Sequence, residues 1–170
     1  MSVDEILENF FFVERGYLNG NHFVYRSPSP VLIDTGYIAD LADTEKAITG
    51  LGVRLSDVSL IINTHTHCDH IGGNAAIQEQ SGCEIALHRI GKHFIDTRDD
   101  WSTWWRYYNQ EARFFQCTQS LETGMWFLSA RTTFMSSIHR GTPPTVLCCT
   151  TVGKKFSSPR TRSGRTMWPS

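Results

Sequence analysis

The stretch that most constrains this chain runs over residues 58–74, VSLIINTHTHCDHIGGN. Its first part is a continuous apolar run, which is typical of a strand buried on both faces. Its second part places four side chains that commonly bind metals within six positions: His65, His67, Asp69 and His70. Gly72 and Gly73 follow and allow a tight turn. The stretch predicts a buried strand that ends in a cluster of metal ligands.

The spacing of these ligands indicates two directions of approach. His65 and His67 lie two positions apart, so in extended backbone both imidazoles point to the same side. Asp69 and His70 follow where the chain turns, so they approach from elsewhere. The pattern therefore predicts two adjacent metal ions, one on the His65/His67 pair and one on the Asp69/His70 pair. The alternative is a polar loop in which histidines gather by chance.

The order His65-x-His67-x-Asp69-His70, after an apolar strand and before Gly-Gly, resembles the signature of the metallo-β-lactamase superfamily. This resemblance implies an αββα sandwich and a hydrolase with two zinc ions, with iron or manganese as alternative metals. The segment PVLIDTG at residues 30–36 is similar to an element that lies beside the metal motif in that superfamily. The resemblance implies that Asp34 supports the motif; a simple turn cap is the alternative.

The first 124 residues alternate between strand and helix patterns, which predicts an α/β layer architecture. Apolar runs bounded by turn residues predict strands, and apolar residues with helical spacing predict helices. The expected strands are 10–14, 21–26, 30–36 and 82–88, and the expected helices are 38–51 and 69–80. His88 and His93 lie outside the ligand pattern, and we expect them to be structural. Cys68 lies between ligand positions, and we expect it to be a packed thiol or one that supports the ligands.

Four aromatic residues recur at i, i+3, i+4 and i+7 and predict one face of a helix: Trp101, Trp104, Trp105 and Tyr108. One interpretation is that this face packs against the domain. The other is an aromatic wall over the metal cleft that holds an apolar or acyl substrate.

Charge divides the chain in two near residue 124. Residues 1–124 hold nine basic and all seventeen acidic residues, a net charge of −8, whereas residues 125–170 hold seven basic and no acidic residues. Periodicity also fails in this second part, where Ser, Thr, Pro and Arg dominate. A basic tail that binds anions or nucleic acid is one interpretation.

A shift of reading frame is the other interpretation of this tail. Synonymous codons for residues 135–170, read one base earlier, also encode a TPGHT element followed by an ISAD element. Both resemble the next ligand-bearing motifs of the superfamily, a third histidine for the first metal and a bridging carboxylate. We therefore expect residues 1–124 to be the N-terminal half of the sandwich, truncated there, and residues 125–170 to be an irregular, out-of-frame, disordered tail outside the family.

The expected function is hydrolysis of a thioester, lactone or related acyl compound, as in glyoxalase II-like relatives, by a chain impaired through truncation. Asp69 is the expected catalytic residue, because it would orient the nucleophilic water. The alternatives are a non-catalytic truncated product, a nuclease or an iron sulfur dioxygenase of the same superfamily. The acidic first part makes nucleic acid an unexpected partner. No signal peptide, disulfide framework or membrane span is expected, so the cytoplasm is the expected location.

Overall fold

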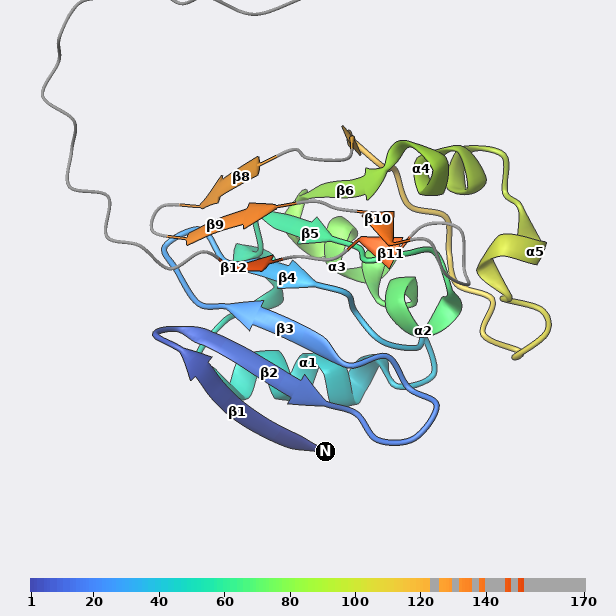
Figure 1. The fold of residues 1–170 in the computed structure, drawn as a ribbon. Helices are drawn as coiled ribbons and strands as arrows, with labels where there is room; N and C mark the ends of the chain where they lie inside the picture. Colours follow the sequence, from blue (N-terminus) through green and yellow to red (C-terminus); the bar gives the residue numbers. More distant parts are fainter. Residues whose placement is uncertain (123–125, 130–131, 136–137, 140–145, 148–149, 152–170) are drawn as a thin grey trace, which may run out of the picture.

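One seven-stranded sheet organises the chain. The computed structural model describes residues 1–122, 126–129, 132–135, 138–139, 146–147 and 150–151, with side chains over residues 1–122. The strands stand in sequence order (Figure 1): β1 Ser2–Leu7, β2 Phe10–Glu14, β3 His22–Tyr25, β4 Val31–Ile33, β5 Leu60–Ile62, β6 Glu84–His88 and β7 Gln119–Leu121. Strands β1 to β4 pair antiparallel, and β4 to β7 pair parallel.

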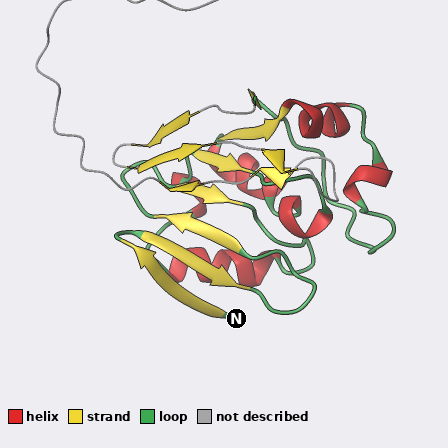
Figure 2. Ribbon diagram, viewed as in Figure 1, coloured by secondary structure: helices red, strands yellow, loops and turns green. Residues whose placement is uncertain are grey.

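Helices connect the parallel strands. The helical elements are α1 Leu41–Gly50, the 3₁₀ turn η1 Leu55–Asp57, α2 Cys68–Ile71, α3 Asn74–Ser81, α4 Arg89–Asp96 and α5 Asp100–Thr103. Helices α1 and α3 cover one face of the sheet and, red in Figure 2, lie behind it in that view. Parallel strands need such crossovers, and helices usually supply them. The predicted α/β architecture is confirmed.

Both faces of the central strands are buried. Along β4, Leu32 belongs to the cluster on the helix side, while Val31 and Ile33 belong to a second cluster. Side chains alternate between the faces of a strand, so a strand without polar positions must be covered on both sides. Ile61 and Ile62 divide in the same way and are fully buried. The continuous apolar run in the sequence therefore marks the middle of the core, as predicted.

After β7, the described residues form only short strands. β8 Trp126–Ser129, β9 Thr132–Met135 and β12 Thr150–Thr151 make one small sheet, and β10 Ile138–His139 pairs with β11 Val146–Leu147. None of them joins the seven-stranded sheet. The predicted disorder falls largely on residues outside the described ones. The domain boundary at residue 124 and the reading-frame hypothesis stay predictions.

The helix expected across the aromatic residues is wrong beyond its first turn. Asp99 caps α5, because its Oδ1 accepts hydrogen bonds from the backbone nitrogens of Trp101 and Ser102. The helix then ends at Thr103, since Trp104 takes a left-handed backbone conformation with φ of 57°. The aromatic spacing predicted a helix here, but it could not show that the helix ends at Thr103.

The expected elements also differ from the observed ones in smaller ways, and neither α4 nor β7 was predicted. The helix expected over residues 69–80 is two helices, α2 and α3, separated at Gly72 and Gly73. The exposed edge strand β1 was not predicted. Within the described part of the chain, no helix is both long and apolar enough to cross a membrane. The cytoplasmic location stays a prediction.

Candidate metal centre

The four predicted ligands lie at the carboxyl ends of the parallel strands, in the loop that follows β5. We call residues 63–73 the motif loop. β4 and β5 run side by side with Ile33 opposite Ile62, so Asp34 leaves β4 where the motif loop leaves β5. The Asp34 backbone nitrogen donates to the Ile62 carbonyl at 3.0 Å. Ligand sites in open α/β sheets form at this edge, because loops from neighbouring strands meet there.

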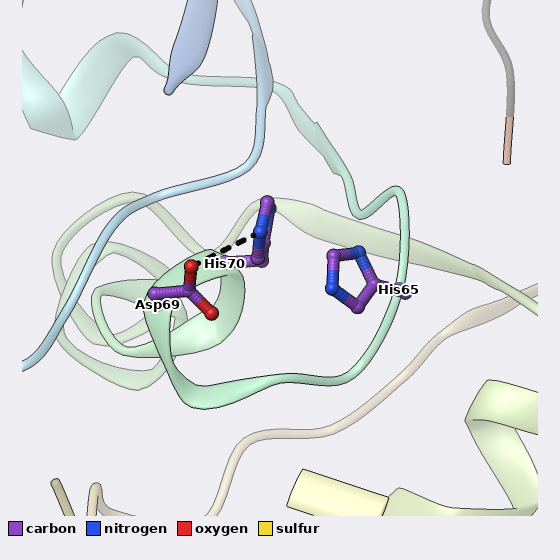
Figure 3. A group of neighbouring side chains, drawn as sticks. All are labelled: His65, Asp69 and His70. Atoms are coloured by element: carbon purple, nitrogen blue, oxygen red, sulfur yellow. Dashed lines mark ion pairs between the residues drawn. The ribbon is translucent and has the colours of Figure 1, made fainter. Parts of the chain in front are cut away.

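Three of the four predicted ligands form a compact group of donors. Ligand atoms of His65, Asp69 and His70 all lie within 4.8 Å of one another, and Figure 3 shows the three side chains turned toward a shared space. His70 Nε2 lies 3.3 Å from Asp69 Oδ2. His67 is outside this group, although its ring centroid lies 4.5 Å from that of His65. The division into two metal pairs stays a prediction.

Asp34 is buried beneath the motif loop and contacts it at several points. Its Oδ2 lies 2.8 Å from His70 Nδ1 and accepts a hydrogen bond from the Thr64 hydroxyl at 2.6 Å. Its Oδ1 accepts from the Thr64 backbone nitrogen at 2.8 Å. Asp34 itself has a positive φ of 61°, which is uncommon outside glycine. The predicted supporting role requires such contacts. A carboxylate bound to Nδ1 of His70 orients the ring so that Nε2 is available to a metal.

The Asp34–His70 pair is strongly polarised. Burial opposes the charge on Asp34, but the charge and hydrogen bond of His70 hold the pKa of that carboxyl below its ordinary value. Burial likewise opposes a charge on His70, yet the Asp34 carboxylate raises the pKa of His70 to about 10. The metal-free pair is therefore ionic. A metal that binds at His70 Nε2 must displace a proton from that atom.

The other ligands are in the protonation states that metal binding needs. Burial, assisted by the charge of His70, lowers the pKa of His65 to about 4. Burial also lowers the pKa of His67. Burial opposes ionisation of Asp69, but its hydrogen bond with His70 holds the pKa of Asp69 below its ordinary value. Two neutral imidazoles and one carboxylate keep free lone pairs near neutral pH, so the donor set fits a zinc-like ion.

A buried polar network ties the motif loop to its neighbours. The Thr35 hydroxyl donates to Asn74 Oδ1 at 2.8 Å, and Asn74 Nδ2 donates to Asn63 Oδ1 at 2.7 Å. Asn63 Nδ2 donates to the His70 carbonyl at 3.0 Å. Thr35, Asn63 and Asn74 are fully buried. Sequence reasoning did not assign this network, because its members are ordinary polar residues in strand-end and helix-start positions.

Two glycines let other segments approach the motif loop closely. A Cβ on Gly20 would lie 2.2 Å from the Asp69 carbonyl oxygen. A Cβ on Gly72 would lie 2.2 Å from the Ile38 backbone nitrogen. Real Cβ atoms do not approach backbone this closely, so both positions require glycine. The loop that joins β2 to β3 therefore packs directly against the ligand-bearing turn.

His22 is a neighbour of the site that sequence reasoning missed. It is fully buried at the start of β3, and among the described residues neither ring nitrogen has a hydrogen-bond partner. Burial, with the nearby Arg15 charge, lowers the pKa of His22 to about 4. A polar residue at the start of an otherwise apolar strand is the sequence signal that could have found it.

The histidines and the cysteine that were set aside lie where structural residues lie. His88 is buried and caps α4, where its Nδ1 accepts from the Ile90 backbone nitrogen. His93 is an exposed residue of α4. Cys68 is buried in α2, and burial raises the pKa of its thiol to about 12. Such a thiol packs as a small apolar group.

His67 is the predicted ligand that contacts the aromatic residues. Its ring stacks on the Trp104 indole with centroids 3.9 Å apart and planes inclined by 18°. An aromatic ring thus lies against the candidate metal centre at Trp104, and the predicted aromatic wall that holds a substrate stays a prediction. Burial against the domain holds for Trp105, which packs on the main core cluster, but not for Trp101, which is 86% exposed.

Comparisons with known proteins agree with this fold. The profile of the Metallo-beta-lactamase superfamily matches residues 19–154, and the chain belongs to that superfamily. A hydroxyacylglutathione hydrolase from Polaromonas sp. is 40% identical over 53 residues, which are 31% of this chain and 20% of that protein.

Solved structures of metallo-β-lactamases share the fold. BJP-1, a subclass B3 metallo-β-lactamase of Bradyrhizobium japonicum, matches with a TM-score of 0.75 at 19% identity, over 93% of this chain and 59% of that one. FEZ-1 from Legionella gormanii matches with a TM-score of 0.73 at 17% identity, over 88% and 57% of the two chains. The chain therefore spans less than two thirds of these relatives.

Proposed function

We propose that this chain is a metal-dependent hydrolase of acyl substrates, acting on a thioester, a lactone or a related compound. The observation that carries the proposal is the convergence of His65, Asp69 and His70 within 4.8 Å, above a buried carboxylate. The acyl substrate is inferred from the hydroxyacylglutathione hydrolase that resembles part of the chain. A small-molecule substrate also suits the net charge of −8 over residues 1–124, which repels nucleic acid.

Each ligand has a defined part in this proposal. His65, His67, Asp69 and His70 hold the metal, with two zinc ions as the expected complement. Bound zinc supplies a water whose pKa is about 7 and polarises a carbonyl. Asp69 is ionised, so it accepts a hydrogen bond from a nucleophilic water and orients it. Asp34 holds the His70 ring in one tautomer through Nδ1.

We further propose that activity of this 170-residue chain is weak. The third histidine and the bridging carboxylate that the superfamily motifs supply have no counterpart in the printed sequence. An incomplete ligand set binds metal less tightly and leaves its coordination open.

Zinc binding to purified chain tests the ligand assignment. We expect zinc to bind the wild-type chain and binding to be lost when His65 and His67 are both replaced by alanine. His93→Ala is the matched control, because His93 is an exposed histidine of α4 outside the centre. Equal zinc binding by the double variant and the wild type would refute the assignment.

Turnover of a thioester by zinc-loaded chain tests the reaction. We expect slow hydrolysis that the double variant lacks. Hydrolysis at the rate of a complete superfamily enzyme would contradict the predicted impairment. No hydrolysis despite stoichiometric zinc would favour the non-catalytic alternative.

A fresh nucleotide read across the codons for residues 122–131 tests the reading-frame hypothesis. One extra or missing base would restore the TPGHT and ISAD elements, and the longer protein should then be assayed. If the nucleotide sequence confirms the given frame, the reading-frame hypothesis is rejected.

A further inference from the structure

A pocket lies beside the candidate metal centre. We call residues 100–110 the aromatic loop. The pocket has a volume of about 740 Å³ and is lined by Asp100, Trp101, Trp104, Arg106, Tyr107 and Tyr108. Pockets that bind small molecules have volumes of roughly 300–1,000 Å³ and mostly apolar and aromatic linings.

The pocket and the metal centre share a wall. Trp104 lines the pocket and stacks on His67, with ring centroids 3.9 Å apart. Tyr108 lies next to Trp104, with centroids 5.9 Å apart. A group bound in the pocket therefore contacts the same ring that stacks on His67. Trp104 holds this position with a φ of 57°, a strained backbone conformation for a tryptophan. Such strain persists where surrounding contacts maintain it, and it concentrates at functional sites.

The lining favours an uncharged, apolar occupant. The two charged lining residues, Arg106 and Asp100, form an ion pair at 3.7 Å, so their charges offset each other. The other lining residues are four aromatic rings. Trp101 and Tyr107 are 86% and 82% exposed, so folding of residues 1–122 leaves their rings unpacked. Large exposed aromatic rings beside a reactive centre mark a binding surface.

We propose that the aromatic loop is the acyl-chain site of this protein. An uncharged alkyl chain lies against Trp101, Tyr107 and Tyr108, and its carbonyl extends past Trp104 toward His67. This inference rests on the proposed hydrolase function and names its substrate more narrowly, as an acyl compound with a medium-length apolar chain.

Binding of unreactive amides to the whole chain tests the pocket without turnover. Octanamide and butanamide are titrated in EDTA by ligand-observed NMR. Each methylene removed from water contributes about fourfold to affinity, so partial burial of four methylenes predicts a Kd for octanamide at least about tenfold lower. Trp101→Ala and Tyr107→Ala should each weaken octanamide binding about threefold or more, with butanamide little changed. Phe114→Ala is the control, because Phe114 is a half-exposed aromatic residue outside the pocket.

The outcomes separate this proposal from the proposed function. Equal affinity for the two amides, or unchanged octanamide binding in both variants, would overturn the acyl-chain site even in an active hydrolase. Chain-length-selective binding that both variants weaken would support the site even in a chain without turnover. Sedimentation tests whether a second copy of the chain occupies this surface instead. If the wild-type chain is a dimer and Trp101→Ala is a monomer, a second copy binds there and the proposal is overturned.

Discussion

The candidate metal centre lies between two regions that are held in opposite ways. On one side, the motif loop is fixed by buried polar contacts to Asp34, Thr35 and Asn74. On the other side, the aromatic loop exposes Trp101 and Tyr107, and its anchors are Trp105 on the core cluster and Trp104 on His67. The buried polar contacts therefore lie beneath the predicted ligands, while part of the aromatic loop remains exposed.

Replacing Asp34 by alanine should give the largest effect. It leaves Nδ1 of His70, whose side chain is 18% exposed, without its carboxylate partner, while Nε2 keeps Asp69. Breaking a buried pair on one side costs about 3–5 kcal/mol. We expect the free energy of unfolding to fall by about that amount in urea, and zinc affinity to fall with it. The matched control is Asp57→Ala, which breaks an exposed ion pair with Arg54 and should change stability far less. If Asp34→Ala and Asp57→Ala lose the same stability, the buried Asp34–His70 pair contributes no more than an exposed ion pair.

The next largest effect should come from His22, which makes the free energy of unfolding depend on pH. Its folded pKa of about 4 is below the ordinary 6.5, so between these values the unfolded state binds a proton that the folded state does not. The stability that His22 contributes is therefore fully present above pH 6.5 and is lost as the pH falls toward 4, by at most about 3 kcal/mol. His65 has a similarly lowered pKa and adds to the same slope.

Urea unfolding of His22→Phe in EDTA from pH 7 to pH 4 measures this contribution. Phenylalanine fills a similar volume and does not titrate, so the variant should lose much less stability on acidification than the wild type. The exposed His93 provides the control, since His93→Phe should leave the slope unchanged. Parallel curves for His22→Phe and the wild type would show that His22 does not titrate in this window.

The sequence predicted the first region well and the second poorly, for physical reasons. The motif loop is local in sequence, and its apolar strand must be buried on both faces. Its support by Asp34 joins residues 36 positions apart and depends on the parallel pairing of β4 with β5. Only the family resemblance suggested it. The aromatic spacing fitted a helix, but the helix ends at Thr103 because Trp104 has a left-handed backbone conformation, and turns follow.

Asn74→Ala should give an intermediate effect. The change removes an acceptor for the Thr35 hydroxyl and a donor to Asn63, and both remaining groups are buried. An unsatisfied buried polar group costs about 1–3 kcal/mol, and we expect a loss in that range by urea unfolding. Gln80→Ala, an exposed change in the same helix, is the control. If the two variants lose the same stability, the network does not support the motif loop.

Trp101→Ala should have the smallest effect on stability, although it removes the largest side chain. Trp101 is 86% exposed, and exposed changes of this kind usually alter stability within about 0.5 kcal/mol. Its backbone nitrogen still donates to Asp99, so the cap of α5 survives the substitution. Asp99→Ala, which removes that cap, should cost about 1 kcal/mol and provides the comparison. A loss for Trp101→Ala larger than that for Asp99→Ala would mean that the aromatic loop folds around its tryptophan. If Trp101→Ala keeps its stability but binds octanamide more weakly, Trp101 contributes to binding and not to folding.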